Sequence, residues 1–149
     1  MVSERKTVIV LGLLVLVEYT LGALVTFSDP LDAGFSLSSF PTTYPAYLPL
    51  VHRLFSIVLI AAWIVLPVSL KGSRAFVLSH ITLGLIVLQA VIGIFIPYTQ
   101  GNPVNNYIVI VHFSVSGLII AAAGFTVMLA WLADRPDGRQ TVRKPSGEN

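Results

Sequence analysis

The chain has 149 residues, of which 55% are hydrophobic and only 11% are charged. With a mean hydropathy of +0.84, this composition excludes an ordinary soluble domain and indicates an integral membrane protein. The chain contains no cysteine, which excludes disulfides, thiolate ligands and cysteine-bound iron–sulfur clusters. The formal net charge of +2 says little about partners. The apolar composition makes the lipid bilayer the expected partner, and we expect no nucleic acid.

Four apolar runs are long enough to cross a membrane, since a bilayer core of about 30 Å needs about 20 apolar residues in a helix. They cover about residues 8–27, 50–70, 75–98 and 107–132. The alternating segments of about 10 residues that are typical of a membrane β-barrel do not occur. The sequence therefore predicts an all-α, integral membrane four-helix bundle within residues 1–133, with no separate soluble domain, and a basic cytoplasmic tail over residues 134–149.

Basic residues lie before the first run, between the second and third runs, and after the fourth. They are Arg5, Lys6, Lys71, Arg74, Arg135, Arg139, Arg143 and Lys144. The other two connections contain Asp29 and Asp32 and no basic residue before Arg53. The positive-inside rule therefore predicts a multi-pass protein of the cell membrane with both termini cytoplasmic. The first run is too long for a cleaved signal peptide and lacks a small-residue cleavage site.

The first and third runs share a short pattern. Glu18 lies four residues before Gly22, and Gln89 lies four residues before Gly93. This spacing places the polar residue and the glycine about one turn apart on one helix face. Each of these runs leads through an outer connection into a run with a histidine near its outer end. The pattern predicts two pseudo-repeated helix pairs, although close helix packing alone also explains the glycines.

His52 and His112 are the strongest candidates for a functional site. Ligating side chains within a membrane are costly and therefore mark functional sites by default. Both histidines lie near the outer ends of their runs, at comparable depth, whereas helix rise places His80 about 20 Å away. Imidazole is a common axial ligand of haem iron, and four helices can surround a porphyrin. We predict that His52 and His112 ligate one haem iron; the alternative is a hydrogen-bonded packing role.

Further polar residues surround the two histidines in the sequence. Arg53 could pair with a haem propionate at the water boundary. Ser56 and Ser116 follow the histidines by one turn and are either hydrogen-bond partners or small packing residues. Glu18, near the centre of its run, could be a neutral structural residue, bond to another helix, relay a proton or contact a substrate. Gln89 is expected to bond between helices, and His80 to bond locally.

Four short motifs, one in each run, resemble one half of haem A synthase. They are Gly22-Ala-Leu-Val, His52-Arg53, Gln89-x-x-x-Gly93 and His112. That family is usually an eight-helix protein made of two four-helix halves, with shorter four-helix archaeal versions. The resemblance covers nearly all of residues 8–132. It implies oxidation of the C8 methyl group of haem O to a formyl group, which gives haem A for respiratory terminal oxidases.

The resemblance also implies a site. The family's haem-ligating histidines match His52 and His112, and the family holds a haem b besides the haem O substrate. One chain supplies a single histidine pair, so a homo-oligomer is needed to present more than one site. Family members commonly carry a glutamate three residues before the first histidine, where this chain has Pro49. Glu18 is then the candidate catalytic carboxylate.

Two other function classes remain open. The departure at Pro49 favours a non-catalytic haem-binding accessory or electron-transfer subunit of a respiratory terminal oxidase complex. A cofactor-free subunit that serves in packing or in cytochrome oxidase assembly is the third. Bound haem separates the first two classes from the third, and conversion of haem O separates the first from the second.

Overall fold

The computed structural model describes residues 4–27, 47–71, 75–99 and 101–133. The predicted basic tail and most of the connection after the first run lie outside these residues. The described chain is helical, with four long helices and one short 3-10 helix. They are α1 (Glu4–Phe27), α2 (Leu48–Ser69), α3 (Ala75–Phe95), η1 (Pro97–Thr99) and α4 (Val104–Ala133). All four long helices are long and apolar enough to cross a membrane, which suggests a multi-pass membrane protein.

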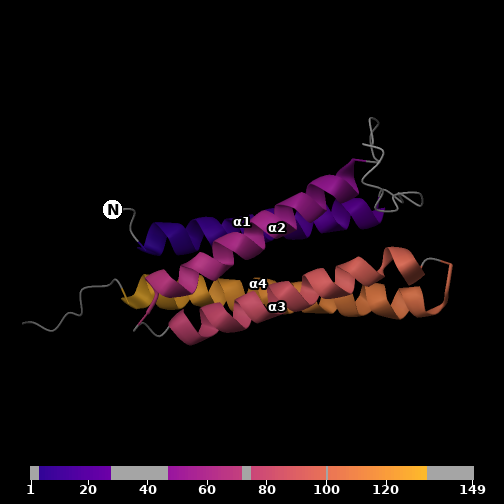
Figure 1. Ribbon diagram of the computed structural model, residues 1–149. Coiled ribbons are helices and arrows are strands. Elements are labelled where there is room, and N and C mark those ends of the chain that lie inside the picture. Colours follow the sequence, from indigo (N-terminus) through magenta and orange to yellow (C-terminus); the bar gives the residue numbers. More distant parts are fainter. Residues whose placement is uncertain (1–3, 28–46, 72–74, 100, 134–149) are drawn as a thin grey trace, which may run out of the picture.

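The helices form two antiparallel pairs, α1 with α2 and α3 with α4 (Figure 1). Each helix also contacts one helix of the other pair, because α1 packs on α4 and α2 packs on α3. The contact between α2 and α3 is the smallest of these four. In Figure 1, α2 runs toward α3 and α4 at its carboxyl-terminal end, whereas the ribbons of the two pairs stand further apart where α2 begins.

The hydrophobic core is concentrated at one end of the bundle. Its most deeply buried members include Val8, Trp63 and Leu66, which are at most 1% exposed. These residues lie near the start of α1 and in the second half of α2, so we call this the packed end. The opposite end, where α2 and α4 begin, is here called the histidine end. Among the described residues of that end, only Leu48 and Pro49 are buried.

Outward-facing positions of the helices carry large apolar side chains. Examples are Ile57 and Val58 on α2 and Val77 on α3, each more than 60% exposed. A soluble protein rarely exposes such a continuous apolar surface. In a bilayer the same surface contacts lipid tails, which agrees with the composition of the chain.

The third candidate span, Ala75–Thr99, covers the predicted run of residues 75–98, but the α-helix within it stops earlier. The helix ends at Phe95 rather than near residue 98, because Pro97 disfavours helical geometry in the residue before it and begins η1. Gly101 then adopts a φ of 78°, a left-handed conformation that glycine adopts without steric cost. The side chain of Asn102 accepts a hydrogen bond from the backbone N–H of Val104 at 2.9 Å and caps α4.

Candidate functional site

The first half of the site is built by α1 and α2. Glu18 and Gly22 lie one turn apart on α1, and Ser56 and His52 lie one turn apart on α2. The Ser56 hydroxyl donates to Oε1 of Glu18. One turn further, a Cβ atom on Gly22 would lie only 3.2 Å from Cε1 of His52. Moving from Glu18 to Gly22 on α1 therefore corresponds to moving from Ser56 to His52 on α2, because the two helices are antiparallel.

The second half of the site, on α3 and α4, makes the same kinds of contact. The Gln89 amide donates to the Ser116 hydroxyl. One turn further, a Cβ atom on Gly93 would lie 3.1 Å from Cε1 of His112. The Ser116 hydroxyl also donates to the backbone carbonyl of His112 at 3.0 Å, and Oγ of Ser56 lies at the same distance from the backbone carbonyl oxygen of His52. In each pair, a glycine therefore leaves the space that the imidazole fills.

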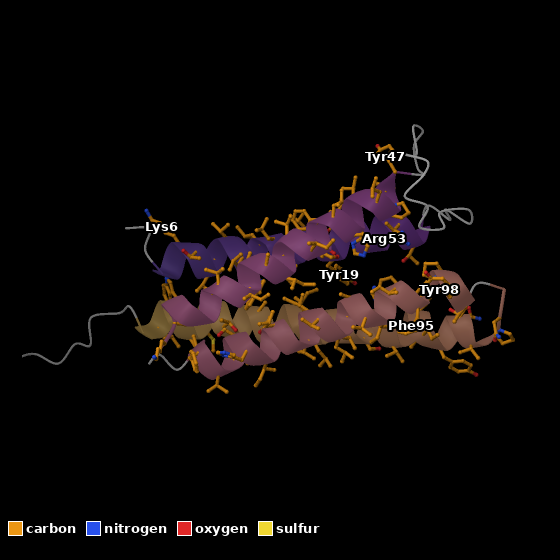
Figure 2. All side chains as sticks on the ribbon, in the orientation of Figure 1. Lys6, Tyr19, Tyr47, Arg53, Phe95 and Tyr98 are labelled. Carbon is orange, nitrogen blue, oxygen red and sulfur yellow. The ribbon has the colours of Figure 1, made fainter. Side chains whose placement is uncertain are left out.

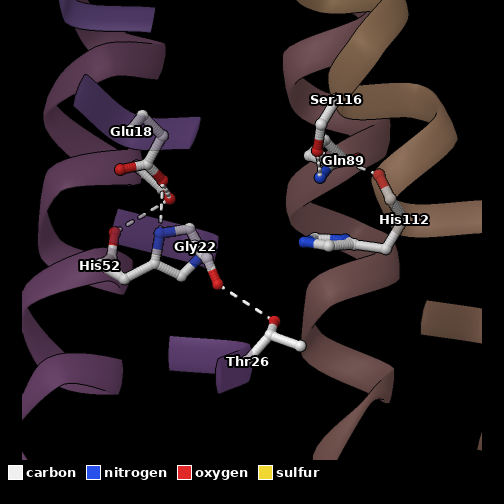
Figure 3. Close-up of polar contacts among 8 residues, drawn as sticks. Glu18, Gly22, Thr26, His52, Gln89, His112 and Ser116 are labelled. Carbon is white, nitrogen blue, oxygen red and sulfur yellow. Dashed lines mark hydrogen bonds and ion pairs between the residues drawn. The ribbon is translucent and has the colours of Figure 1, made fainter. Parts of the chain in front are cut away.

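The two imidazoles lie on facing sides of the helix pairs. Figure 3 shows the His112 ring extending from α4 toward the α1–α2 pair, and the His52 ring on the side of α2 that faces α3 and α4. The rings stand at a similar height along the bundle in this view. Both histidines are partly buried. The fold therefore brings the two predicted ligands to one level of the bundle from opposite sides.

The two histidines differ in what faces Nδ1. Nδ1 of His52 lies 3.0 Å from Oε1 of Glu18, with side-chain exposures of 22% and 14%. The distance is that of a hydrogen bond, although the angle is not that of a regular one. Nδ1 of His112 is buried and has no hydrogen-bond partner among the described residues. Glu18 is the only carboxylate within the four candidate spans.

Buried polar atoms without a partner gather at this level. In the part of the chain that the structure describes, they are Glu18 Oε2, His52 Nδ1, Gln89 Oε1 and His112 Nδ1, and, toward the packed end, Trp63 Nε1. Native proteins pair nearly all buried polar atoms, so a cluster of exceptions needs a specific explanation. A ligand or water held between the helix pairs would supply one.

Two histidines are few ligands for a bare metal ion, but they are enough for a metal that is already bound within a cofactor. No group of three or more His, Cys, Asp or Glu side chains that could hold a bare metal ion occurs within the described ranges. Structural zinc needs about four protein ligands, whereas haem iron needs one or two axial ligands from the protein. Two facing histidines therefore supply enough protein ligands for a group that brings most of its own, and too few for a bare structural ion.

The other predicted residues have separate places. Arg53 follows His52 on α2 and is partly buried, and Figure 2 shows it at the histidine end of the bundle, as it does Tyr98. Pro49 is buried in the first turn of α2, where a helix has no partner for a backbone N–H and proline is tolerated. At this position it can serve only in packing and in starting the helix.

His80 is separate from the site. It lies 13 residues before Gly93 on α3, which is about 20 Å of helix rise. Its side chain is exposed, and Nδ1 lies 2.8 Å from the backbone carbonyl of Phe76. A carbonyl can only accept, so Nδ1 carries the proton. The local bond expected for His80 is therefore confirmed.

The contact between each glycine and a histidine is the feature that the sequence reading missed. The sequence pattern suggests a pseudo-repeat or close helix packing for the glycines, and neither explanation identifies the residue that each glycine contacts. A usable signal was present, because the polar-to-glycine spacing on α1 equals the histidine-to-serine spacing on α2, with the order reversed. The same holds for α3 and α4. When two antiparallel neighbours have equal spacings, the polar residue can lie beside the serine while the glycine lies beside the histidine.

Comparison of the chain with models of protein families, with curated proteins and with solved structures finds no match. The function is therefore argued from the chemistry of the two helix pairs and from the sequence motifs.

Proposed function

We propose that this chain is a membrane haem protein in which His52 and His112 are the two axial ligands of one iron. One observation carries the proposal: two imidazoles, each set against a glycine, face one another from separate helix pairs. Nδ1 of His52 faces Glu18, which leaves Nε2 for a metal. The small number of buried side chains at the histidine end is consistent with a site for a large flat cofactor.

The reaction that we propose is that of haem A synthase, and the four sequence motifs support it. Oxidation of the C8 methyl group of haem O to a formyl group removes four electrons, which one molecule of dioxygen balances with release of one water. Bound haem b would supply the redox chemistry. The residues of the chain would ligate iron through His52 and His112, pair a propionate with Arg53 and place the Glu18 carboxylate beside one ligand. Haem A is the product.

A second candidate is a non-catalytic subunit that holds haem for electron transfer or for a terminal oxidase complex. Pro49 favours it, because a proline in the first turn of α2 supplies no acid or base near His52. In this candidate function the same two histidines ligate haem, but the chain does not oxidise haem O. Bound haem without product is its signature.

The arrangement in the membrane belongs to the proposal as well. We propose that both termini are cytoplasmic, that the two helix pairs are pseudo-repeats, and that the chain forms homo-oligomers or joins terminal oxidase subunits in the cell membrane. Because the chain has no cysteine, single cysteines can report its orientation. A cysteine at Lys71 should resist a membrane-impermeant maleimide in intact cells, and one at Tyr98 should react. The opposite pattern would overturn the orientation.

One preparation tests the function. The protein is expressed with and without a haem O source and purified. Spectra of the oxidised and reduced forms are recorded, and extracted haem is separated by reversed-phase chromatography. Haem A that appears only with this chain supports the synthase. A low-spin haem spectrum without conversion supports the electron-transfer or accessory subunit. A preparation that lacks a Soret band under adequate haem supply refutes both.

A further inference from the structure

The two helix pairs differ in one chemically important position. Glu18 and Gln89 occupy corresponding places, one turn from a glycine, and each contacts the serine of its partner helix. Only the carboxylate also reaches an imidazole, at 3.0 Å from Nδ1 of His52. Neither Nδ1 makes a regular hydrogen bond with a described residue, so the difference between the two imidazoles is the nearby carboxylate, which only His52 has. The direction of the serine contact differs as well, because Ser56 donates to Glu18 whereas Gln89 donates to Ser116. Both differences follow from the exchange of an acid for an amide.

A carboxylate beside Nδ1 changes how an imidazole binds a metal. It fixes the proton on Nδ1, holds the plane of the ring and raises the basicity of Nε2. Loss of such a partner typically weakens metal binding 10- to 100-fold. A stronger imidazole donor also stabilises ferric over ferrous iron and therefore lowers the reduction potential. An imidazole without a carboxylate near Nδ1 lacks this contribution.

We infer that Glu18 is a positioning residue for His52 and that it makes the two axial ligands unequal. His52 is the firm ligand and His112 the exchangeable one, so the iron opens to small exogenous ligands on the α3–α4 side. This inference rests on the proposed function and deepens it. It assigns Glu18 a role in ligand strength in place of direct contact with substrate.

The decisive experiment combines single-ligand variants with an exchange of the two polar residues. In the otherwise native chain, His112→Ala should retain haem about tenfold more tightly than His52→Ala, because the remaining ligand keeps its carboxylate. In the background Glu18→Gln with Gln89→Glu, the order should reverse. A residue that serves only in packing would not reverse it. Haem affinity is measured by titration of the apoprotein in detergent, followed by the Soret band.

A second measurement uses the chain with both histidines. Glu18→Gln should raise the ferric/ferrous midpoint potential by about 59 mV, which for one electron corresponds to a roughly tenfold change in the redox equilibrium constant. It should not slow binding of carbon monoxide to the ferrous form, since His112 stays exchangeable and His52 becomes the weaker ligand that it is without its carboxylate. If Glu18→Gln fails to fold, Gln89→Glu alone is informative, because a second carboxylate beside His112 should lower the potential.

The outcomes separate the inference from the proposed function. Low-spin haem in the native chain, with an unchanged potential in both variants and no reversal of affinity, overturns the role of Glu18 and leaves the proposed ligands in place. Absence of bound haem in every preparation overturns both. Reversal of the affinity order together with the shift in potential supports both.

Discussion

The closest contacts of the site lead to a strong prediction for Gly22→Ala. The new Cβ would lie 3.2 Å from Cε1 and 3.6 Å from Nε2 of His52, and ordinary van der Waals contact begins at 3.4 Å. The imidazole must therefore move by a few tenths of an ångström. Gly93→Ala imposes the same change on His112, with a Cβ-to-Cε1 distance of 3.1 Å.

The expected magnitude follows from the cost of overpacking. Adding carbon to a close-packed contact typically costs about 1–3 kcal/mol. Because the overlap at Gly22 is small, we expect the lower end, about 1 kcal/mol, which corresponds to a roughly fivefold loss of haem affinity. Gly22→Val adds two further carbon atoms where the ring already fills the space. It should cost about 3 kcal/mol, or roughly 100-fold in affinity.

The assay is titration of the apoprotein with haem, followed by the Soret band and the low-spin electron paramagnetic resonance signal. Gly84→Ala and Gly117→Ala are matched controls, because a Cβ at either position meets nothing within 4 Å. Alanine is also the better helix former by about 1 kcal/mol, so these controls should retain haem. Equal haem affinity in Gly22→Ala, Gly93→Ala and both controls would refute the proposed support of the imidazoles by glycine.

Two further predictions concern the ligands and the contact between the helix pairs. His52→Ala and His112→Ala should each abolish the six-coordinate low-spin spectrum, whereas His80→Ala should preserve it; an unchanged spectrum in both of the first two variants would end the ligation hypothesis. Gly12→Ala should destabilise the packing of α1 on α4 by about 1–3 kcal/mol, because its Cβ would lie 2.9 Å from Cγ2 of Val127. Adding Val127→Ala should recover part of that loss in detergent unfolding, and strictly additive costs would contradict the contact.

Hydropathy and spacing predicted much of the fold. Four apolar runs became four helices, because the length of an apolar run is a local property of the chain. The bond of Gln89 to a neighbouring helix was also predicted, and the structure identifies Ser116 as its partner. The boundaries were less accurate, since α1 begins at Glu4 and α4 at Val104, before the apolar runs. Polar residues at a helix start do not appear in a hydropathy window.

The glycine contacts of the site could not be read in the same way. Which residue of α1 meets His52 depends on the register between two helices, and side-chain packing sets that register. The motif Glu18-x-x-x-Gly22 shows that the two residues share a face and does not show what the face contacts. The partnership of Glu18 with both Ser56 and His52 likewise emerges only when the helices are placed side by side.

The contacts of each histidine lie within its own helix pair, and this has a consequence for how the protein assembles. Each histidine receives its glycine and serine contacts from its own antiparallel hairpin, so each hairpin can arrange its ligand before it meets the other. Most of the buried side chains that the two hairpins share lie at the packed end. A cofactor bound by both histidines would therefore connect the hairpins at the opposite end, where fewer buried contacts join them. Two fragments, one ending at Lys71 and the other beginning at Ala75, should then associate in one membrane more tightly with haem than without it.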